Sequence, residues 1–220
     1  MTVIFPPEDV NREHPVGLQE RADVQGPLDF VWASADHLTR LHQRLAAAAA
    51  KEGIVDVSYT TVETPVGLLL LAATEHGLVR VAFDREDHNE VLESLANKLG
   101  GRILRAPSVL VEASREISEY FAGTRRSFEL PLDYSLSAGF RRQVQQLLPQ
   151  IAYGHTQTYK DMALMAGNPK AVRAVGTACA TNPLPIVIPC HRVLRSDGGL
   201  GGYLGGVEAK TALLELEGAV

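Results

Sequence analysis

Three short segments of β pattern, joined by two tight turns, characterise the front half of this 220-residue chain. Residues 57–63 alternate and are rich in Val, Thr and Tyr, whereas 68–73 and 78–83 are short apolar runs. Thr64-Pro65-Val66-Gly67 and Glu75-His76-Gly77 supply turn residues between these segments. Strands separated by so few residues pair with their neighbours in an antiparallel meander. The pattern therefore predicts a small antiparallel sheet.

Helical spacing dominates most of the remaining chain, and glycines end several of the predicted helices. In the first helix, Leu38, Leu41 and Leu45 follow at intervals of three and four, so we expect their common face to pack against the protein. A change of pattern near 132–137 predicts a domain boundary. The helices are predicted at 34–51, 86–99, 108–121, 138–150, 159–166, 169–181 and 207–217.

We therefore predict an α+β protein in three parts. Residues 1–53 form an irregular arm and a helix to which the sequence assigns no function. Residues 54–136 form an N-terminal domain that combines the small antiparallel sheet with helices. Residues 137–220 form a mainly helical C-terminal domain, which contains both cysteines, Cys179 and Cys190.

The composition excludes several classes of protein. Two cysteines cannot build a disulfide-dense secreted scaffold or a four-cysteine zinc site. Few zinc-type ligands accompany His14, His37 and His42, and the last two fall on different faces of the predicted helix, so we predict no metal. No apolar run approaches the roughly 20 residues that span a bilayer, and the N-terminus lacks a signal-peptide pattern. We therefore expect a cytoplasmic protein with no membrane partner.

Charge is distributed unevenly along the chain. The net charge of −5 argues against a nucleic-acid partner for the chain as a whole. From residue 138 onward, however, eight Lys and Arg stand against five Asp and Glu, a net charge of +3, whereas the preceding residues carry −8. This asymmetry is compatible with a polyanion that contacts only the C-terminal part.

The predicted helices at 159–166 and 169–181 have the spacing of a helix-turn-helix. Asn168 is a favourable N-cap for the second helix, and Pro169 suits its first position. One face of this thin, alanine-rich helix consists of Lys170, Arg173 and Thr177. A thin helix with a cationic face suits a DNA groove, although an ordinary helix hairpin with a solvated face has the same pattern.

The segment 186–193 contains an adjacent cysteine and histidine. Pro189 favours an extended conformation for Ile188, so the apolar run is predicted to lead as a strand up to Cys190. Adjacent side chains on extended backbone point apart. Cys190 and His191 would therefore need a bridging water or a local turn to interact.

Two interpretations of this cysteine compete. The positive charge of His191 and Arg192 favours the thiolate, which is the nucleophilic form. Against this, most free cysteines are small buried hydrophobic residues. We expect burial for Cys179, because it shares an apolar helix face with Val172 and Val175.

A series of short motifs occurs in order between residues 159 and 218. They are Tyr159, Asn168-Pro169-Lys170, Arg173-Ala174-Val175-Gly176, Asn182-Pro183, Ile188-Pro189-Cys190-His191-Arg192-Val193, Gly202-Tyr203 and Leu216-Glu217-Gly218. In this combination the chain resembles the O6-alkylguanine-DNA alkyltransferases, the methylated-DNA–protein-cysteine methyltransferases. The resemblance is close over residues 140–218 and looser over 55–123.

The resemblance implies a DNA repair protein that inactivates itself. Cys190 would attack the alkyl carbon on O6 of guanine and keep the alkyl group, with O4-alkylthymine as a further candidate substrate. His191 would accept the thiol proton through a water, while Glu217 orients the imidazole. Asn182 would shape the active-site turn, and Tyr159 would hydrogen-bond the base and help neutralise the departing guanine.

By the same resemblance, the partner is double-stranded DNA, bound in its minor groove by a protein that is monomeric in solution. Arg173 would take the place of a flipped nucleotide, because O6 cannot be reached for in-line attack inside the duplex. The resemblance implies no cofactor, since the damaged DNA supplies the alkyl group. Further DNA contacts would come from Lys170, Ala171, Ala174 and Thr177, and the pocket would be lined by Val193, Gly202, Tyr203 and Leu204.

Two positions depart from the family pattern. Gln145 follows Val144 where relatives often carry Trp, which implies altered packing. Leu204 stands where a small or polar residue is usual in some relatives, so it would narrow the pocket for bulky adducts.

Three alternative functions would each use part of the same set of residues. The family includes members that recognise alkylated DNA with the cysteine replaced, and the presence of Cys190 argues against that class. A cysteine hydrolase would need a remotely placed histidine and an oxyanion hole, but only His191 is specifically placed. A plain helix-turn-helix regulator would leave the segment 186–193 unexplained.

Overall fold

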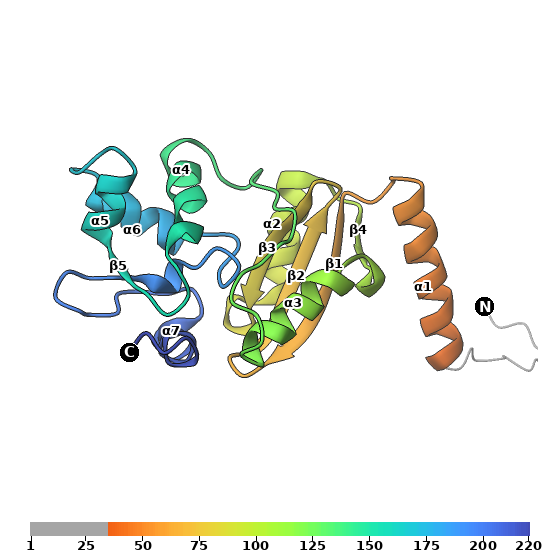
Figure 1. The fold of residues 1–220 in the computed structure, drawn as a ribbon. Coiled ribbons are helices and arrows are strands. Elements are labelled where there is room, and N and C mark those ends of the chain that lie inside the picture. Colours follow the sequence, from red (N-terminus) through yellow and green to blue (C-terminus); the bar gives the residue numbers. More distant parts are fainter. Residues whose placement is uncertain (1–34) are drawn as a thin grey trace, which may run out of the picture.

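The computed structural model describes residues 35–220, so the arm predicted before the first helix, and His14 within it, lie outside the described residues. Within the described part, a four-stranded sheet with two helices forms one half, and shorter helices form the other (Figure 1). This arrangement confirms the predicted α+β class. None of the described helices is both long and apolar enough to cross a membrane.

The predicted meander forms the body of the sheet. Its antiparallel strands are β1 (Val57–Thr64), β2 (Gly67–Thr74) and β3 (Gly77–Phe83). β4 (Ile103–Arg105) pairs parallel to β1 and completes the order β3-β2-β1-β4. The sequence does not predict β4, because three residues are too few to show an alternating pattern.

One helix covers each face of this sheet. Alternate residues of a strand point to opposite faces, and those of β2 divide accordingly between the two helices, which are α2 (His88–Leu99) and α3 (Val111–Phe121). Leu70 lies in one buried cluster with Leu95 of α2, whereas Leu71 lies in the other with Ile117 of α3. The short 3-10 helices η1 (Asp84–Glu86) and η2 (Pro107–Val109) precede them.

The C-terminal half consists of helices around a pair of short parallel strands. Its helices are α4 (Gly139–Leu147), α5 (Tyr159–Met165), α6 (Val172–Ala180) and α7 (Gly206–Leu216). Its other elements are η3 (Leu148–Gln150), β5 (Gln157–Thr158), η4 (Cys190–Arg192) and β6 (Val193–Leu194). These helices lie where the periodicity predicts them, apart from the start of α6.

The two halves share one hydrophobic core. Val81 of β3 and Tyr120 of α3 belong to the same buried cluster as Val144 of α4 and Leu213 of α7, and all four are fully buried. The outer edge of β3 is also paired, because Val81 N donates to Pro183 O at 2.8 Å. A covered edge protects a sheet from unwanted pairing. Here the covering segment belongs to the loop that leads to Cys190.

α1 (Ala35–Lys51) is present as predicted, but its leucines do not pack. Leu38, Leu41 and Leu45 are 57%, 45% and 60% exposed, so the expected packing face is wrong for these residues. α1 stands apart from the sheet half (Figure 1), and no described element covers its leucines. Among the side chains of this helix that the structure describes, Ala46 and Ala49 are buried.

α6 begins later than predicted. Asn168 does not cap the helix with its side chain; its carbonyl oxygen accepts a hydrogen bond from Ala171 N at 2.9 Å, within a turn that contains Pro169. The first helical residue is Val172, and no side chain caps it. Lys170 and Ala171 therefore precede the helix rather than lie on it.

Candidate active site

Cys190 and Asn182 lie together at the two ends of a buried loop. Cys190 is 2% exposed and Asn182 is fully buried. The Asn182 amide nitrogen Nδ2 donates to Ile188 O at 2.8 Å and to Cys190 Sγ at 3.2 Å. Its carbonyl oxygen Oδ1 accepts from Leu184 N at 3.1 Å. One side chain therefore closes the loop and contacts the sulfur.

This loop is folded on itself, so the predicted strand up to Cys190 is wrong. Ile188 N donates to Leu184 O at 2.8 Å, and Ile186 has a φ of 75°. A left-handed conformation is a strained one for a β-branched residue, and it persists only where the surroundings enforce it. The Asn182 amide and the internal turn pair several of the loop's buried backbone groups, as buried polar groups require.

His191 is held by a buried carboxylate. Its Nε2 lies 2.9 Å from Glu217 Oε1, and the side chains of both residues are fully buried. Burial lowers the pKa of His191 despite the opposing effect of Glu217, so the ring is neutral at pH 7. Nε2 then donates to the carboxylate, which leaves Nδ1 as an acceptor, and Nδ1 is buried without a partner.

Glu217 also binds residues that the sequence did not associate with it. Arg192 Nε donates to Glu217 Oε2 at 2.8 Å and Arg192 Nη2 donates to Oε1 at 2.9 Å, while Tyr120 Oη donates to Oε1 at 2.7 Å. Burial alone would raise the pKa of Glu217, but hydrogen bonds from His191 and Arg192 lower it to about 2. No sequence signal links these residues, because they come from α3, η4 and the residue that follows α7.

The thiol of Cys190 is not ionised at rest, contrary to the expectation from its neighbours in sequence. Burial raises the pKa of Cys190 to about 11, although the hydrogen bond from Asn182 and the charge of Lys210 act to lower it. The guanidinium of Arg192 is paired with Glu217 instead of the sulfur. The neutral ring of His191 brings no positive charge either.

Lys210 of α7 is a buried cation that the sequence analysis missed. It is fully buried, and its Nζ donates to Val193 O at 2.6 Å and to Leu200 O. Burial lowers its pKa, while the nearby Cys190 raises it. Through these bonds Lys210 joins β6 to the glycine-rich loop before α7. In the sequence, this lysine cannot be distinguished from a solvent-exposed lysine on a helix, so no pattern indicated that it is buried.

Of the residues predicted to line the pocket, Tyr203 lies next to the histidine of the site. The Tyr203 ring lies 6.4 Å from the His191 ring, and its hydroxyl is buried without a partner. Burial raises the pKa of Tyr159 to about 12, so its hydroxyl stays protonated. Val193 is fully buried, whereas Gly202 is exposed.

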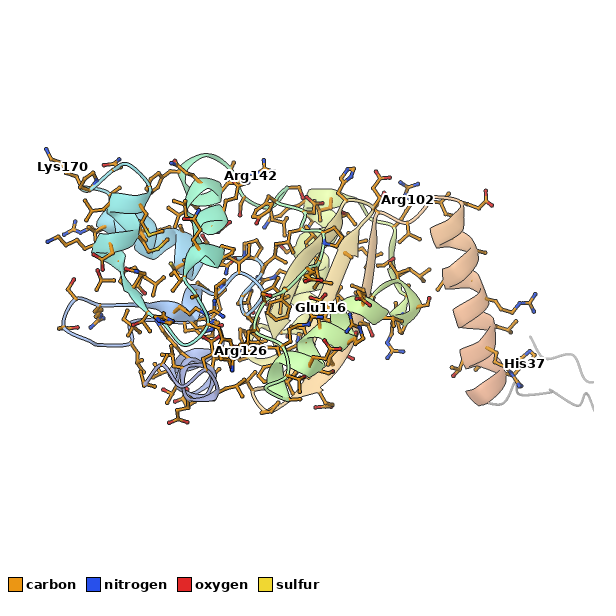
Figure 2. All side chains as sticks on the ribbon, in the orientation of Figure 1. His37, Arg102, Glu116, Arg126, Arg142 and Lys170 are labelled. Atoms are coloured by element: carbon orange, nitrogen blue, oxygen red, sulfur yellow. The ribbon has the colours of Figure 1, made fainter. Side chains whose placement is uncertain are left out.

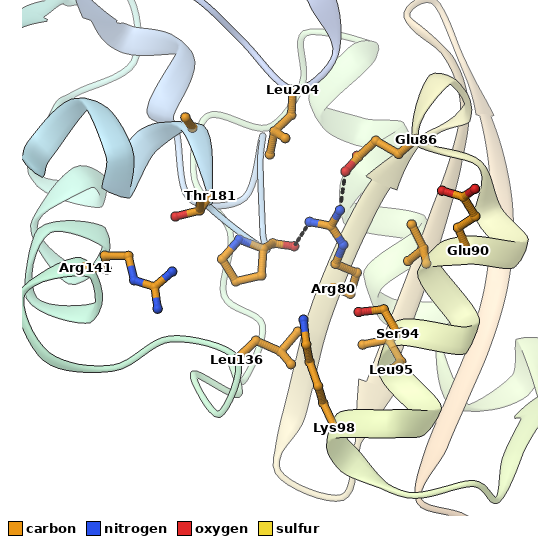
Figure 3. A pocket seen from close by; sticks show the side chains of 13 residues that line it. Arg80, Glu86, Glu90, Ser94, Leu95, Lys98, Leu136, Arg141, Thr181 and Leu204 are labelled. Atoms are coloured by element: carbon orange, nitrogen blue, oxygen red, sulfur yellow. Dashed lines mark hydrogen bonds and ion pairs between the residues drawn. The ribbon is translucent and has the colours of Figure 1, made fainter.

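Leu204 lines a crevice between the two halves of the molecule. The crevice has a volume of about 470 Å³ and opens between α2 and the start of the loop that leads to Cys190. Figure 3 shows Leu204 at the top of the crevice. Arg80, Glu86 and Lys98 line it from the sheet half, and Arg141 of α4 lies across from them.

The predicted DNA-contact residues are accessible at one end of the molecule. Arg173, Ala174 and Thr177 are exposed on α6, Lys170 is exposed just before it, and Ala171 is half-buried. Figure 2 shows Lys170 at the outer end of the C-terminal half. The opposite face of α6 carries Cys179, which is buried as expected.

No group of three or more metal-ligating side chains occurs within residues 35–220. Both cysteines are free thiols.

Two family profiles match the chain. The profile described as "6-O-methylguanine DNA methyltransferase, ribonuclease-like domain" matches residues 57–134. The profile described as "6-O-methylguanine DNA methyltransferase, DNA binding domain" matches residues 139–219.

Similar proteins agree with these profiles. The constitutive methylated-DNA–protein-cysteine methyltransferase of Bacillus subtilis is 42% identical over 160 residues, which cover 72% of this chain and 94% of that protein. The corresponding protein of Methanosarcina barkeri is 40% identical and covers 72% of this chain and 96% of its own length.

Solved structures show the same fold. The Mycobacterium tuberculosis O6-methylguanine methyltransferase superposes with a TM-score of 0.65 at 34% identity, and the match covers 74% of this chain and 93% of that one. A structure of Mycobacterium tuberculosis OGT in complex with DNA superposes over the same shares, with a TM-score of 0.63 and 34% identity. The chain therefore belongs to the methylated-DNA–protein-cysteine methyltransferases, a family of DNA-binding repair enzymes.

Proposed function

We propose that this protein removes alkyl groups from O6 of guanine in double-stranded DNA by transferring them irreversibly to Cys190, one per protein molecule. The observation that carries the proposal is the arrangement around the sulfur. Asn182 binds Cys190 Sγ, and the adjacent His191 presents an unpartnered buried Nδ1 while Glu217 holds its other nitrogen. This is a nucleophile beside a base whose orientation is fixed by a third group.

The first step is proton removal from the thiol. Because the pKa of Cys190 is about 11, a base must accept its proton for the reactive thiolate to form at neutral pH. No hydrogen bond joins Cys190 Sγ to the His191 ring, so a water that bonds Nδ1 would carry the proton between them. The anionic Glu217 then stabilises the imidazolium.

The second step is displacement at the alkyl carbon. The thiolate attacks this carbon, a carbon–sulfur bond forms, and the carbon–O6 bond breaks with its electron pair left on guanine. Tyr159, whose raised pKa keeps its hydroxyl protonated, donates a hydrogen bond to the base and helps neutralise the departing guanine. The thioether has no route back to a thiol, so the protein acts once. The damaged DNA supplies the alkyl group, and no cofactor takes part.

Access to the base requires DNA binding by the C-terminal domain. α6 presents Arg173, Ala174 and Thr177 to the minor groove, with Lys170 and Ala171 at its start. The target nucleotide flips out of the helix, at a cost of a few kcal/mol, and Arg173 takes its place in the stack. The net charge of +3 beyond residue 138 supports this orientation of a monomer on DNA.

The substrate pocket is bounded by Val193, Gly202, Tyr203 and Leu204. Leu204, which follows Tyr203 where some relatives have a small or polar residue, would disfavour bulky alkyl groups. O4-methylthymine is the second candidate substrate. In this proposal residues 137–220 form the catalytic and DNA-binding domain and residues 54–136 form the N-terminal α+β domain, while no role is assigned to residues 1–53.

A methyl-transfer assay tests the proposal. The protein is mixed with a duplex that carries one tritium-labelled O6-methylguanine, and protein-bound label is counted. Wild type and the matched control Cys179→Ser should each take up a single methyl group, whereas Cys190→Ser should take up none and still bind the duplex. Label on Cys190→Ser would make the assignment of the cysteine wrong. Lesion binding by wild type without transfer would favour the recognition-only alternative.

A further inference from the structure

An ion pair in the sheet half reaches the loop that leads to the reactive cysteine. Arg80 of β3 and Glu86 of η1 form a salt bridge, and both side chains are only 15% exposed. The other terminal nitrogen of Arg80, Nη1, lies 3.4 Å from Pro183 O (Figure 3). The backbone of the same strand binds the same carbonyl, since Val81 N donates to Pro183 O at 2.8 Å. Both lone pairs of this carbonyl oxygen are therefore engaged by the sheet half.

Pro183 directly follows Asn182, the residue whose amide binds the sulfur of Cys190. A displacement of the Pro183 carbonyl would move the Asn182 backbone with it. The loop beyond contains the left-handed Ile186, a conformation that external contacts must enforce. The anchor of Pro183 on β3 is such a contact, and the ion pair reinforces it.

The same ion pair fixes the opposite wall of the site. Glu86 Oε1 accepts a hydrogen bond from Phe83 N at 2.9 Å. The Phe83 ring contacts the Tyr203 ring edge-to-face, with 5.6 Å between their centroids. A Cβ at Gly205 would lie 2.7 Å from the Phe83 ring, so the chain after Tyr203 is packed closely against this strand.

We propose that the Arg80–Glu86 ion pair is a positioning element for the transfer reaction. It holds the Pro183 carbonyl in place, and thereby also the Asn182 amide that orients the sulfur of Cys190. The sheet half is then part of the reactive site rather than a neighbouring support. The expected effect on the rate of alkyl transfer rests on the proposed function. Arg80 and Glu86 touch no reacting atom, so both are positioning residues.

The test uses the full chain in a Cys179→Ala background, so that Cys190 is the only thiol. Two quantities are measured for each variant: the rate of benzyl transfer from free O6-benzylguanine, and the pH midpoint of Cys190 alkylation by iodoacetamide. Arg80→Met removes the charge and the donors. Arg80→Lys retains the charge, and Glu86→Gln removes the partner's charge. Arg102→Met is the matched control, since Arg102 pairs with Asp56 and takes no part in the contacts described above.

Arg80→Met should slow benzyl transfer by about tenfold or more, because small misplacements of a reacting group cost up to about 100-fold. Its alkylation midpoint should move to higher pH, because the Asn182 hydrogen bond favours the thiolate. Arg80→Lys should recover part of both effects, and Arg102→Met should match the background protein. A purely structural role for Arg80 would lower the melting temperature without moving the midpoint.

A double-mutant cycle with Asn182→Ser tests whether Arg80 acts through Asn182. Arg80→Met should then have no further effect on the midpoint, because interacting residues are not additive. Additive effects, or an unchanged rate and midpoint in a folded Arg80→Met protein, would overturn the proposal. Should Arg80→Met fail to fold, an unchanged midpoint in Glu86→Gln would overturn it instead. If the wild type transferred no methyl group from duplex O6-methylguanine, the proposed function would fail, while the iodoacetamide midpoints would still test the positioning.

Discussion

Glu217 accepts hydrogen bonds from three side chains that lie far apart in the sequence. Tyr120, His191 and Arg192 all bind its two oxygens inside the protein. A buried carboxylate is costly unless it is paired and hydrogen-bonded. The same network that stabilises the anion also fixes the His191 ring, so stability and reactivity depend on one side chain.

The stability of the protein should therefore depend on the ionisation of Glu217. Its pKa is about 2 in the folded protein against 4.5 ordinarily. A lowered pKa contributes stability above pH 4.5, about 3 kcal/mol here, and this is lost as the pH falls toward 2. Urea unfolding of wild type between pH 7 and pH 3 should show this loss, to which the lowered pKa of His191 adds.

Glu217→Gln should destabilise the protein at pH 7 by about 3–5 kcal/mol, because it leaves Arg192 buried without a counter-charge. The variant should also show a weaker decline of stability with acid than the wild type. An equal pH dependence in the two proteins would mean that Glu217 is not the group that titrates.

Lys210 should influence the reactivity of the Cys190 thiol. Because its charge lowers the pKa of Cys190, Lys210→Met should raise that pKa. At a fixed pH below the midpoint, the rate of alkylation by iodoacetamide should fall about tenfold for each unit of increase. The rate is measured in a Cys179→Ala background, with Lys160→Met on the exposed start of α5 as control. A lower midpoint in Lys210→Met would contradict the assigned effect.

At the residue scale, the reactive residues could be predicted from the sequence more easily than the contacts that surround them. Cys190, His191 and Asn182 lie in one motif region, so their association could be predicted. Tyr120 and Lys210 could not be found, because each meets the site only through long-range packing between elements.

At the scale of elements, α6 combines two functions. Its inner face contributes Val175 and Cys179 to the core, while its outer face presents Arg173 and Thr177. The chain then turns at Asn182 directly into the loop that contains the sulfur. Thr177 on the outer face is thus only five residues before Asn182, whose amide contacts the sulfur.

Arg173→Ala should slow methyl transfer from duplex DNA much more than benzyl transfer from free O6-benzylguanine, because only the duplex requires a flipped base. Lys170→Ala is the matched comparison. It should leave both transfer rates at saturating substrate nearly unchanged and reduce the salt dependence of duplex binding by about one unit. Single-turnover assays and salt titrations measure these effects, and equal losses of Arg173→Ala on both substrates would refute the role of Arg173.

The elements that the sequence predicted well are those with a period. The meander and the amphipathic helices could be predicted because the alternation or helical spacing of apolar residues is visible within a short stretch of sequence. The active-site loop was misread because Pro189 restricts only the residue before it. The folded conformation of the loop depends on the Asn182 amide, whose contacts with Ile188 and Cys190, six and eight residues away, leave no local sequence pattern.

At the scale of the whole molecule, the two halves are joined by one core and by the edge of β3. Val81 and Tyr120 pack in the same cluster as Val144 and Leu213. The pairing of Val81 with Pro183 links the sheet to the reactive loop. The sequence indicated a boundary near 132–137, but it gave no sign that the core continues across it.

The shared core predicts cooperative unfolding of the two halves. Ile117→Ala in α3 and Leu213→Ala in α7 should each lower the stability by about 2–5 kcal/mol, because both side chains are fully buried. Each substitution should shift a single transition, followed by circular dichroism and by accessibility of the Cys190 thiol. Leu38→Ala on the exposed face of α1 is the control and should change little. Two separate transitions would show that the halves unfold independently.

The claim that Cys190 is the permanent alkyl acceptor can be tested directly by mass spectrometry of the intact protein and its peptides. The protein is incubated with an excess of duplex that carries O6-methylguanine. The account predicts one added methyl group per molecule, located on the peptide that contains Cys190, and no further repair once all molecules are modified. An unmodified protein, repeated turnover, or a methyl group on Cys179 or any other residue would contradict it.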